Sequence, residues 1–398
     1  MINENLNINL GELLSSLSLS LDIAENRSYE HSRRTAFIAF NIARNMGLDK
    51  KLIDNIYYAS FIHDIGMTGQ MSSYSIDTVH KNINLKREHC RIGGEISKDL
   101  PLDDEISDFI KYHHEEWNGS GPYGLKENEI PLGAQIIHLA DMFDISYCYG
   151  FNKDFDKYKV KKWVNVSKGE LFNPEIADVF LDLLEKERFI FDLHIYNLPR
   201  VLEIIKPTHN KVIRIQELKK IAKAFSGLID SKSRFTYIHS KGVAKITRNI
   251  STYMGYDDII LEKLEIAALL HDLGKLIVPN YILEKPGKLT QKEFEIIKSH
   301  PYYTKLTLNQ VKGLEDIAKW AGNHHEKLNG EGYPEKLTYE EMDYKDQIIA
   351  VSDVYQALTE DRPYRKGMKP KEAISILESM VKNGHIINDV VKALKAVV

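Results

Sequence analysis

The chain carries the same four-residue pattern twice. His63-Asp64-Ile65-Gly66 recurs 208 positions later as His271-Asp272-Leu273-Gly274. Each copy is far longer than the roughly 20 to 50 residues of a stacked repeat, so we predict two globular domains that each bury a core. The other polar residues that recur at nearly this spacing are Asp22 and Asp230, His31 and His239, His89 and His300, His113-His114-Glu115 and His324-His325-Glu326, and Asp141 and Asp353.

Apolar residues follow helical spacing in both copies. Leu218, Ile221, Phe225 and Leu228 fall on one face of a helix, and no long alternating run predicts a strand. The predicted class is therefore all-α, with two tandem helical-bundle domains related by duplication. Proline and glycine positions predict a first domain at 1–194, a join at 195–212 that contains a short helix at 200–205, and a second domain at 213–398.

Bulk composition excludes several classes of partner. A chain of 398 residues with a net charge of -4 has no surface suited to coating a nucleic acid polymer. Apolar stretches such as 266–270 are too short to cross a bilayer, and residues 1–10 lack a secretion signal, so we expect a cytoplasmic protein without a membrane segment. The two cysteines are too few for a disulfide framework, and Cys90 is expected to be a buried free thiol.

The residues that both copies keep are mostly metal-ligand types. Helical bundles build metal sites from inward-pointing side chains of several helices. A carboxylate can bridge two ions with its two oxygens, whereas each imidazole gives one nitrogen to one ion, so Asp272 is expected to be shared by two metals. Imidazole and carboxylate without thiolate suit iron or manganese and leave zinc as an alternative. Two ions about 3.5 to 4 Å apart would bind a phosphodiester and activate water.

The simplest alternative is that these are core histidines inherited by duplication. Fifteen histidines produce about one His-Asp pair by chance, so a single pair would be weak evidence. Inheritance explains the repeat, but it does not explain why the identical positions are metal-ligand types while the apolar positions differ.

The order of motifs in the second copy points to a family. The motifs are His271-Asp272-Leu273-Gly274-Lys275, His300, His324-His325-Glu326, Asn329-Gly330-Glu331-Gly332-Tyr333-Pro334, Asp353 and Asp361-Arg362-Pro363-Tyr364-Arg365. This order resembles the HD-GYP subgroup of the HD-domain phosphohydrolases over about residues 213–398. The resemblance implies a helical phosphodiesterase with two or three metal ions. Its substrate would be a cyclic dinucleotide, with cyclic di-GMP expected first and 3′,3′-cyclic GMP-AMP second, and its product a linear dinucleotide or mononucleotides.

The resemblance also implies roles for individual residues. His239, His271, Asp272 and Asp353 would hold one ion, and Asp272, His300, His324 and His325 the other. Residues 234–238 lack a carboxylate for a third ion, so two ions are expected, iron or manganese, with zinc and nickel as alternatives. Asp272 and Lys275 are the expected catalytic residues, and the residues expected to contact substrate are Lys275, Tyr333, Gln356, Arg362 and Arg365.

Two positions depart from the family pattern. Gln356 and Asn329 stand where members commonly have aspartate. An amide both donates and accepts hydrogen bonds, whereas a carboxylate only accepts, so recognition of the bases is expected to change. A mixed or adenine-containing ring therefore stays open as substrate.

The first copy keeps the ligands but loses the residues around them. Met67 replaces the lysine, Gly121-Pro122-Tyr123 replaces Gly-Tyr-Pro, and nothing after Asp141 matches Arg-Pro-Tyr-Arg. We hypothesise that this domain binds metal but is a poor catalyst with a regulatory role; the alternative is a second full phosphodiesterase. Its expected ligands are His31, His63, Asp64, His89, His113, His114 and Asp141.

Two other functions remain open from the sequence. An HD-superfamily enzyme acting on another nucleotide would need only His239, His271, Asp272 and Asp353, which leaves the remaining histidines unexplained. A non-catalytic cyclic-dinucleotide sensor or scaffold would explain the degenerate first copy, yet the second copy has lost no ligand. The expected macromolecular partner is a second copy of the chain, in a homodimer, or a signalling protein.

Overall fold

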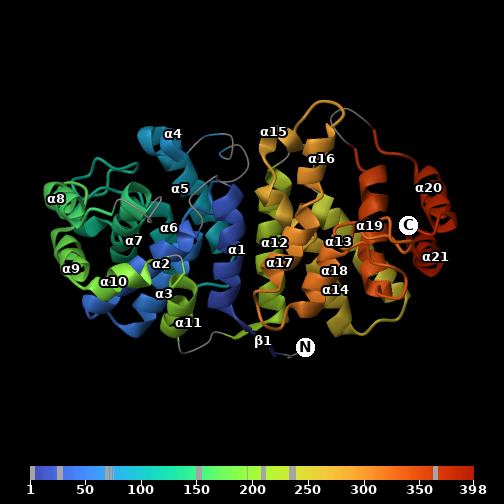
Figure 1. Cartoon of the computed structure of the whole chain (residues 1–398), viewed down its shortest axis with the longest axis horizontal. Helices are drawn as coiled ribbons and strands as arrows, with labels where there is room; N and C mark the ends of the chain where they lie inside the picture. Colours follow the sequence, from blue (N-terminus) through green and yellow to red (C-terminus); the bar gives the residue numbers. More distant parts are fainter. Residues whose placement is uncertain are drawn as a thin grey trace. The chain divides into compact units, whose positions relative to one another are not determined.

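The computed structural model describes residues 5–24, 30–67, 71, 74, 76–148, 155–194, 196–207, 212–232, 239–361 and 366–398. These residues form two compact units (Figure 1). The first unit comprises residues 17–210, and the second comprises residues 1–16 and 211–398. The all-α prediction is confirmed, because nearly every element within the described ranges is helical. None of the described helices is long and apolar enough to cross a membrane.

The α-helices that lie wholly in the first unit are 6 to 16 residues long. The predicted helix at 200–205 is present as α11. Its elements are α2 (His31–Asn45), α3 (Lys50–Ile62), α4 (Ile76–Lys81), α5 (Ile83–Lys98), α6 (Asp104–Tyr112), η2 (Glu127–Glu129), α7 (Leu132–Phe143), the π-helical turn η3 (Asp144–Cys148), α8 (Lys157–Ser167), α9 (Pro174–Leu184), α10 (Glu187–Asp192) and α11 (Leu198–Ile205).

The second unit repeats this arrangement and adds a small sheet. The helix α1 (Leu10–Ala24) spans the boundary between the units, which falls after Ser16. The other elements are β1 (Asn5–Asn9), β2 (Val212–Arg214), α12 (Ile215–Ser231), α13 (His239–Tyr253), α14 (Asp258–Leu270), η4 (Leu273–Ile277), α15 (Asn280–Leu283), α16 (Gln291–Ile297), α17 (His300–Leu308), α18 (Glu315–Gly322), α19 (Tyr344–Thr359), α20 (Pro370–Lys382) and α21 (Asn388–Val397).

The observed units differ from the predicted domains at the N-terminus. Residues 1–16 were expected in the first domain but belong to the second unit. β1 pairs antiparallel with β2, so that Ile8 faces Ile213, and both side chains are buried. The hydroxyl of Ser16 also donates to the carbonyl of Thr307. Backbone pairing between segments about 200 residues apart leaves no local pattern in the sequence. The prediction therefore divided the chain only at the join, 195–212, and kept residues 1–16 in the first domain.

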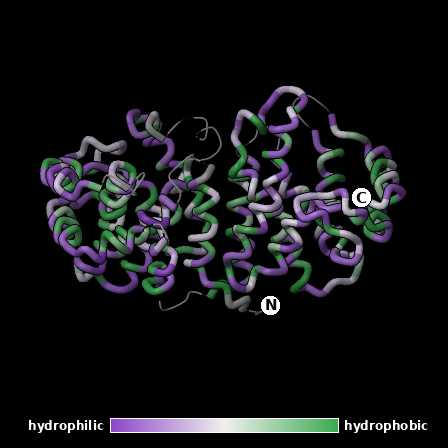
Figure 2. The backbone as a smooth tube through the Cα atoms, in the orientation of Figure 1, coloured by the Kyte–Doolittle hydropathy of each residue, from purple (hydrophilic) through white to green (hydrophobic). Residues whose placement is uncertain are grey.

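Apolar helix faces form the core of each unit. Phe37, Phe61 and Phe180 are almost completely buried in the first unit, and Phe225 and Leu264 in the second. Figure 2 shows hydrophobic and hydrophilic residues alternating along the helices, as expected for helices with one buried face.

Corresponding caps begin the helices that lead to the His-Asp motifs. The carboxylate of Asp49 accepts from the backbone N–H of Leu52, and that of Asp257 accepts from the N–H of Ile260. Such caps satisfy an otherwise unpaired N–H group at the start of a helix. The capped helices α3 and α14 end directly before His63 and His271, so each cap helps to position a histidine of the motif.

Candidate metal centres

The repeated polar residues of the second unit meet at helix ends. α13 begins at His239, α14 ends directly before His271, and α17 begins at His300. The pair His324-His325 follows α18, and Asp353 lies within α19. Ligand atoms of His239, His271 and Asp353 lie within 4.8 Å of one another, as do those of His300 and the pair His324-His325.

The two carboxylate oxygens of Asp272 face different histidines. Oδ2 lies 3.3 Å from Nε2 of His271, whereas Oδ1 lies 3.3 Å from Nε2 of His300 and 3.9 Å from Nε2 of His324. Atoms that bind one ion at about 2.1 Å lie roughly 3.0 to 3.4 Å apart. The two 3.3 Å separations therefore fit a carboxylate that bridges two ions, one beside His271 and one beside His300.

Asp353 completes one of these two sets. Its Oδ1 lies 3.1 Å from Nε2 of His239 and 3.9 Å from Nε2 of His271. The set has two imidazoles and two carboxylates if Asp272 contributes Oδ2. Such a donor set fits a divalent transition metal ion.

Backbone carbonyls orient the histidine rings. Nδ1 of His271 lies 2.7 Å from the carbonyl oxygen of Ala268, and Nδ1 of His324 lies 2.7 Å from that of Ala321. His300 makes the same contact with a carbonyl three residues earlier, at 2.6 Å. A carbonyl only accepts, so Nδ1 carries the proton and Nε2 directs its lone pair into the centre.

Burial and neighbouring charge set the protonation states. Burial lowers the pKa of His300 and His324 and lowers that of His325 to about 3, so these rings are neutral at neutral pH. Burial opposes ionisation of Asp272, but the charges of His271 and Lys275 hold its pKa well below the ordinary value. Although burial opposes it, the charge of Asp272 in turn raises the pKa of His271, so a metal ion that binds there displaces a proton from this ring. Neutral imidazoles and an ionised carboxylate are the forms that bind metal.

The first unit reproduces the divided arrangement of its central carboxylate. Oδ2 of Asp64 lies 3.1 Å from Nε2 of His63, and Oδ1 lies 3.1 Å from Nε2 of His89 and 3.9 Å from Nε2 of His113. Among the described residues, both ring nitrogens of His114 are buried without a hydrogen-bond partner. Unsatisfied buried nitrogens are costly, and a metal ion would satisfy them.

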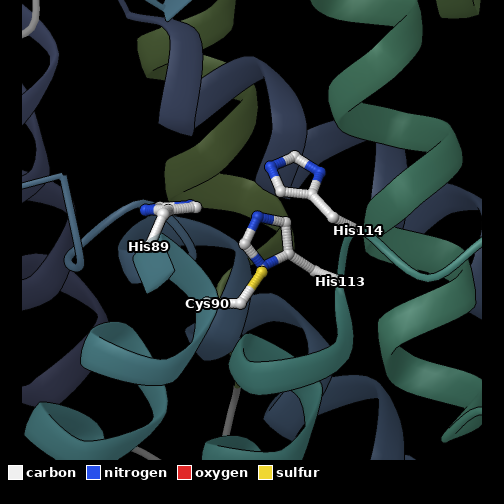
Figure 3. Close-up of side chains that lie close together, drawn as sticks. All are labelled: His89, Cys90, His113 and His114. Carbon is white, nitrogen blue, oxygen red and sulfur yellow. The ribbon is translucent and has the colours of Figure 1, made fainter. Parts of the chain in front are cut away.

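Cys90 lies beside this histidine group but on its outer side. Figure 3 shows the sulfur next to the ring of His113. The contact is with Nδ1, at 3.8 Å, whereas Nε2 is the atom that faces Asp64. Cys90 is a free, buried cysteine, and burial raises the pKa of its thiol, so the expectation of a buried free thiol is confirmed.

A glutamate organises the loop after each histidine pair. Glu326 accepts from the backbone N–H groups of Glu335 and Leu337 at 2.6 and 3.0 Å. Glu115 accepts from those of Tyr123 and Leu125 at 2.6 and 2.7 Å. The sequence showed that this glutamate repeats but gave no role for it. It shapes the loop that carries Gly-Tyr-Pro in the second copy and Gly-Pro-Tyr in the first.

The residues expected to contact substrate take several positions. The amine of Lys275 pairs with Oδ2 of Asp272, and the ring of Tyr333 lies 4.9 Å from that of His325. Gln356 donates from Nε2 to the carboxylate of Glu360 at 3.0 Å and packs against Gly242. The predicted phosphate ligands Arg362 and Arg365 lie outside the described residues.

Sequence reasoning missed the role of one repeated aspartate. Asp230 accepts from the backbone N–H and the hydroxyl of Ser240, with 2.7 Å between the hydroxyl and Oδ1. Asp22 accepts from the same two groups of Ser32. Each serine follows the first histidine of its copy, so each aspartate anchors the start of the helix that carries this histidine. The matching spacing of Asp22 and Asp230 was the available signal.

The comparisons with known proteins agree with these groups of histidines and aspartates on helical bundles. The model of the HD domain family matches residues 17–150 and 223–389, and the chain belongs to this family. It is 30% identical over 402 residues to 3′3′-cGAMP-specific phosphodiesterase 1 of Vibrio cholerae, covering 98% of this chain and 92% of that protein. It is 28% identical over 420 residues to 3′3′-cGAMP-specific phosphodiesterase 3 of the same organism, covering 93% of this chain and 90% of that protein.

A solved structure and a shorter match complete the comparison. The crystal structure of a cyclic GMP-AMP specific phosphodiesterase of V. cholerae matches with a TM-score of 0.72 and 26% identity, over 98% of this chain and 97% of that one. A cyclic di-GMP phosphodiesterase of Pseudomonas aeruginosa is 37% identical over 173 residues, which cover 42% of this chain and 41% of that protein.

Proposed function

We propose that the chain is a metal-dependent phosphodiesterase that hydrolyses a cyclic dinucleotide in its second unit. The observation that carries this proposal is the division of the Asp272 oxygens between His271 on one side and His300 and His324 on the other. A carboxylate between two imidazole sets can hold two ions close together, as two-metal hydrolysis of a phosphodiester needs.

The preferred ring is 3′,3′-cyclic GMP-AMP. The relatives that align with more than nine-tenths of this chain are named for that substrate. The cyclic di-GMP phosphodiesterase of P. aeruginosa aligns with less than half of the chain. The sequence placed cyclic di-GMP first and kept the mixed ring as the second candidate; similarity over the whole length favours the mixed ring.

The second unit would hold two ions, iron or manganese. When bound, such ions supply an activated water and offset negative charge on the phosphate. Lys275 is half-buried with its amine on the bridging Asp272, so it adds a cation beside the reacting phosphate, where charge develops. Tyr333 lies against His325 and forms part of the wall beside the proposed second ion. Arg362 and Arg365 would bind the other phosphate of the ring, because guanidinium groups suit that geometry.

The first unit is proposed to bind metal with little catalysis and to regulate the second. It keeps the divided carboxylate, but the position of Lys275 is taken by Met67, which is 2% exposed. Without the amine, charge on a reacting phosphate has one fewer partner. A catalytically active first unit is the competing function, and the experiment below separates the two.

The test is hydrolysis of three rings by full-length protein loaded with manganese or iron. The substrates are 3′,3′-cyclic GMP-AMP, cyclic di-GMP and cyclic di-AMP. A variant carrying His271→Ala and Asp272→Ala disables the second unit, and the matched variant His63→Ala with Asp64→Ala disables the first. We expect turnover of the mixed ring to disappear in the first variant and to persist in the second.

Two other results would contradict the proposal. Turnover that survives in the His271→Ala, Asp272→Ala variant would place catalysis in the first unit. Binding of a ring without turnover under either metal would identify the chain as a cyclic-dinucleotide sensor.

A further inference from the structure

The first unit has a histidine at its centre that the second copy lacks. His80 lies in the last turn of α4, and the corresponding segment 288–291 reads Lys-Leu-Thr-Gln. The ring of His80 lies 4.8 Å from that of His114, centre to centre. Ligand atoms of His80, His114 and Asp141 lie within 4.8 Å of one another. Small side-chain shifts would bring the three ligand atoms into reach of one metal ion.

Apolar packing places His80 at this position. Its neighbour Val79 is fully buried in a cluster with Met67 and Met71, and Leu85 packs against the same cluster. Met67 stands where the second copy has Lys275, whose amine pairs with the bridging Asp272. The first copy thus has an apolar side chain in place of the cation, and that side chain helps to seat the helix carrying His80.

His80 reaches residues from both expected ligand sets. By its position in the repeat, Asp141 belongs with His31 and His63, whereas His114 belongs with His89. His114 is 1% exposed, and both of its ring nitrogens are buried without a hydrogen-bond partner among the described residues. Two-metal hydrolysis needs room between the two ligand sets for a water and a phosphate oxygen. A side chain that reaches both sets would take up that room.

We propose that His80 is an additional ligand of a divalent transition metal ion in the first unit and that it closes this centre to phosphodiesters. Metal sites whose positions are all filled by protein are structural, and catalytic sites keep one position open. The inference rests on metal binding by the first unit and gives a physical reason for its weak catalysis.

The test uses full-length protein carrying His271→Ala and Asp272→Ala, which removes the bridging carboxylate of the second centre, and manganese retained after adding His63→Ala and Asp64→Ala is subtracted. After loading with Mn²⁺ and dialysis, bound manganese is measured by elemental analysis. Access to the ion is measured as the phosphorus-31 relaxation rate of inorganic phosphate per bound manganese. The comparison is between this protein and versions that add His80→Ala or the milder His80→Gln. Lys81→Ala, in the same turn of α4, is the matched control.

We expect manganese to bind with His80 present and to leave phosphate relaxation close to that of metal-free protein. His80→Ala and His80→Gln should each raise relaxation per bound ion several-fold, and Lys81→Ala should not. Equal relaxation with and without His80 would overturn the closure. Absence of manganese from the first centre would also overturn it, while the proposal of catalysis by the second unit, tested with His271 and Asp272 present, would still stand.

Discussion

Glu360 lies directly behind His239, with its Oε2 3.1 Å from Nδ1 of that ring. In the first unit the corresponding contact is made by Asp144, whose Oδ2 lies 2.7 Å from Nδ1 of His31. The position that matches Asp144 in the second copy is Gln356, which donates to Glu360. The carboxylate behind the first histidine has therefore moved four residues along the chain in the second unit.

Removing this carboxylate should weaken metal binding by the second unit. A carboxylate behind a metal-binding histidine orients the ring and raises its basicity, and its loss costs about 10-fold to 100-fold in metal affinity. We expect Glu360→Gln to show this loss in a competition titration with a chelator. Adding Gln356→Asp to that variant should recover most of the affinity by restoring the arrangement of the first unit. Unchanged affinity in Glu360→Gln would show that the contact is not used.

A methyl group at Gly274 should displace His300. A Cβ built on Gly274 would lie 2.0 Å from the carbonyl oxygen of His300. Gly274→Ala is expected to lower the free energy of unfolding by about 1 to 3 kcal/mol, as overpacking does, and to reduce metal content. Gly227→Ala is the control, because a Cβ added at Gly227 in α12 would meet nothing within 4 Å. This substitution should raise the free energy of unfolding by about 0.5 to 1 kcal/mol. Denaturant unfolding and elemental analysis measure both effects.

Asp346 should make the second unit less stable as pH rises from about 4 to 6. Burial raises its pKa from 3.8 to about 6, although the backbone N–H of Asp343 donates to it. The folded state therefore holds the proton more tightly than the unfolded state. The resulting stability is complete below the unfolded pKa and is lost as pH passes through the folded pKa.

The shift corresponds to roughly 2 to 3 kcal/mol. Asp346→Asn cannot titrate, so unfolding free energies measured at pH 4 and pH 6.5 should differ less in the variant than in the native protein. An identical pH dependence in both would contradict the raised pKa.

Met67→Lys should destabilise the first unit without making it an efficient enzyme. Met67 is 2% exposed and packs with Met71 and Val79, so a lysine amine there would be buried among apolar side chains. The amine could pair with Asp64, three residues earlier, as Lys275 pairs with Asp272, but a buried ion pair is often less stable than packed apolar side chains by about 1 to 4 kcal/mol. Thermal unfolding of Met67→Lys against Met67→Leu measures the effect. High phosphodiesterase activity in Met67→Lys, with the second unit disabled, would show that the lysine alone was missing.

The duplication could be predicted because polar identities recur at matched spacing in both copies, and the grouping of the histidines was implied by the resemblance to the HD-GYP subgroup. His239, His271 and Asp353 meet as the sequence predicted, and so do His300, His324 and His325. Whether these residues bind metal stays a prediction that the experiments above address.

Other features depended on three-dimensional packing. Glu360 replaces Asp144 from a different position, and His80 has no counterpart, so neither belongs to a repeated pattern. β1 precedes the first unit in the sequence and β2 follows it, so their pairing joins two short and distant segments. Such contacts follow from how helices pack, and a single sequence does not encode them in its spacing.

The pairing of β1 with β2 makes the second unit discontinuous in sequence, with the first unit inserted into it. During translation, residues 1–16 leave the ribosome long before β2 is made. The two-stranded sheet can therefore form only after β2 has been synthesised. A fragment that begins at residue 213 would lack β1 as well as the Ser16 contact to the carbonyl of Thr307, in the helix that begins at His300. Dividing this protein into two independent halves therefore requires moving its first sixteen residues to the second half.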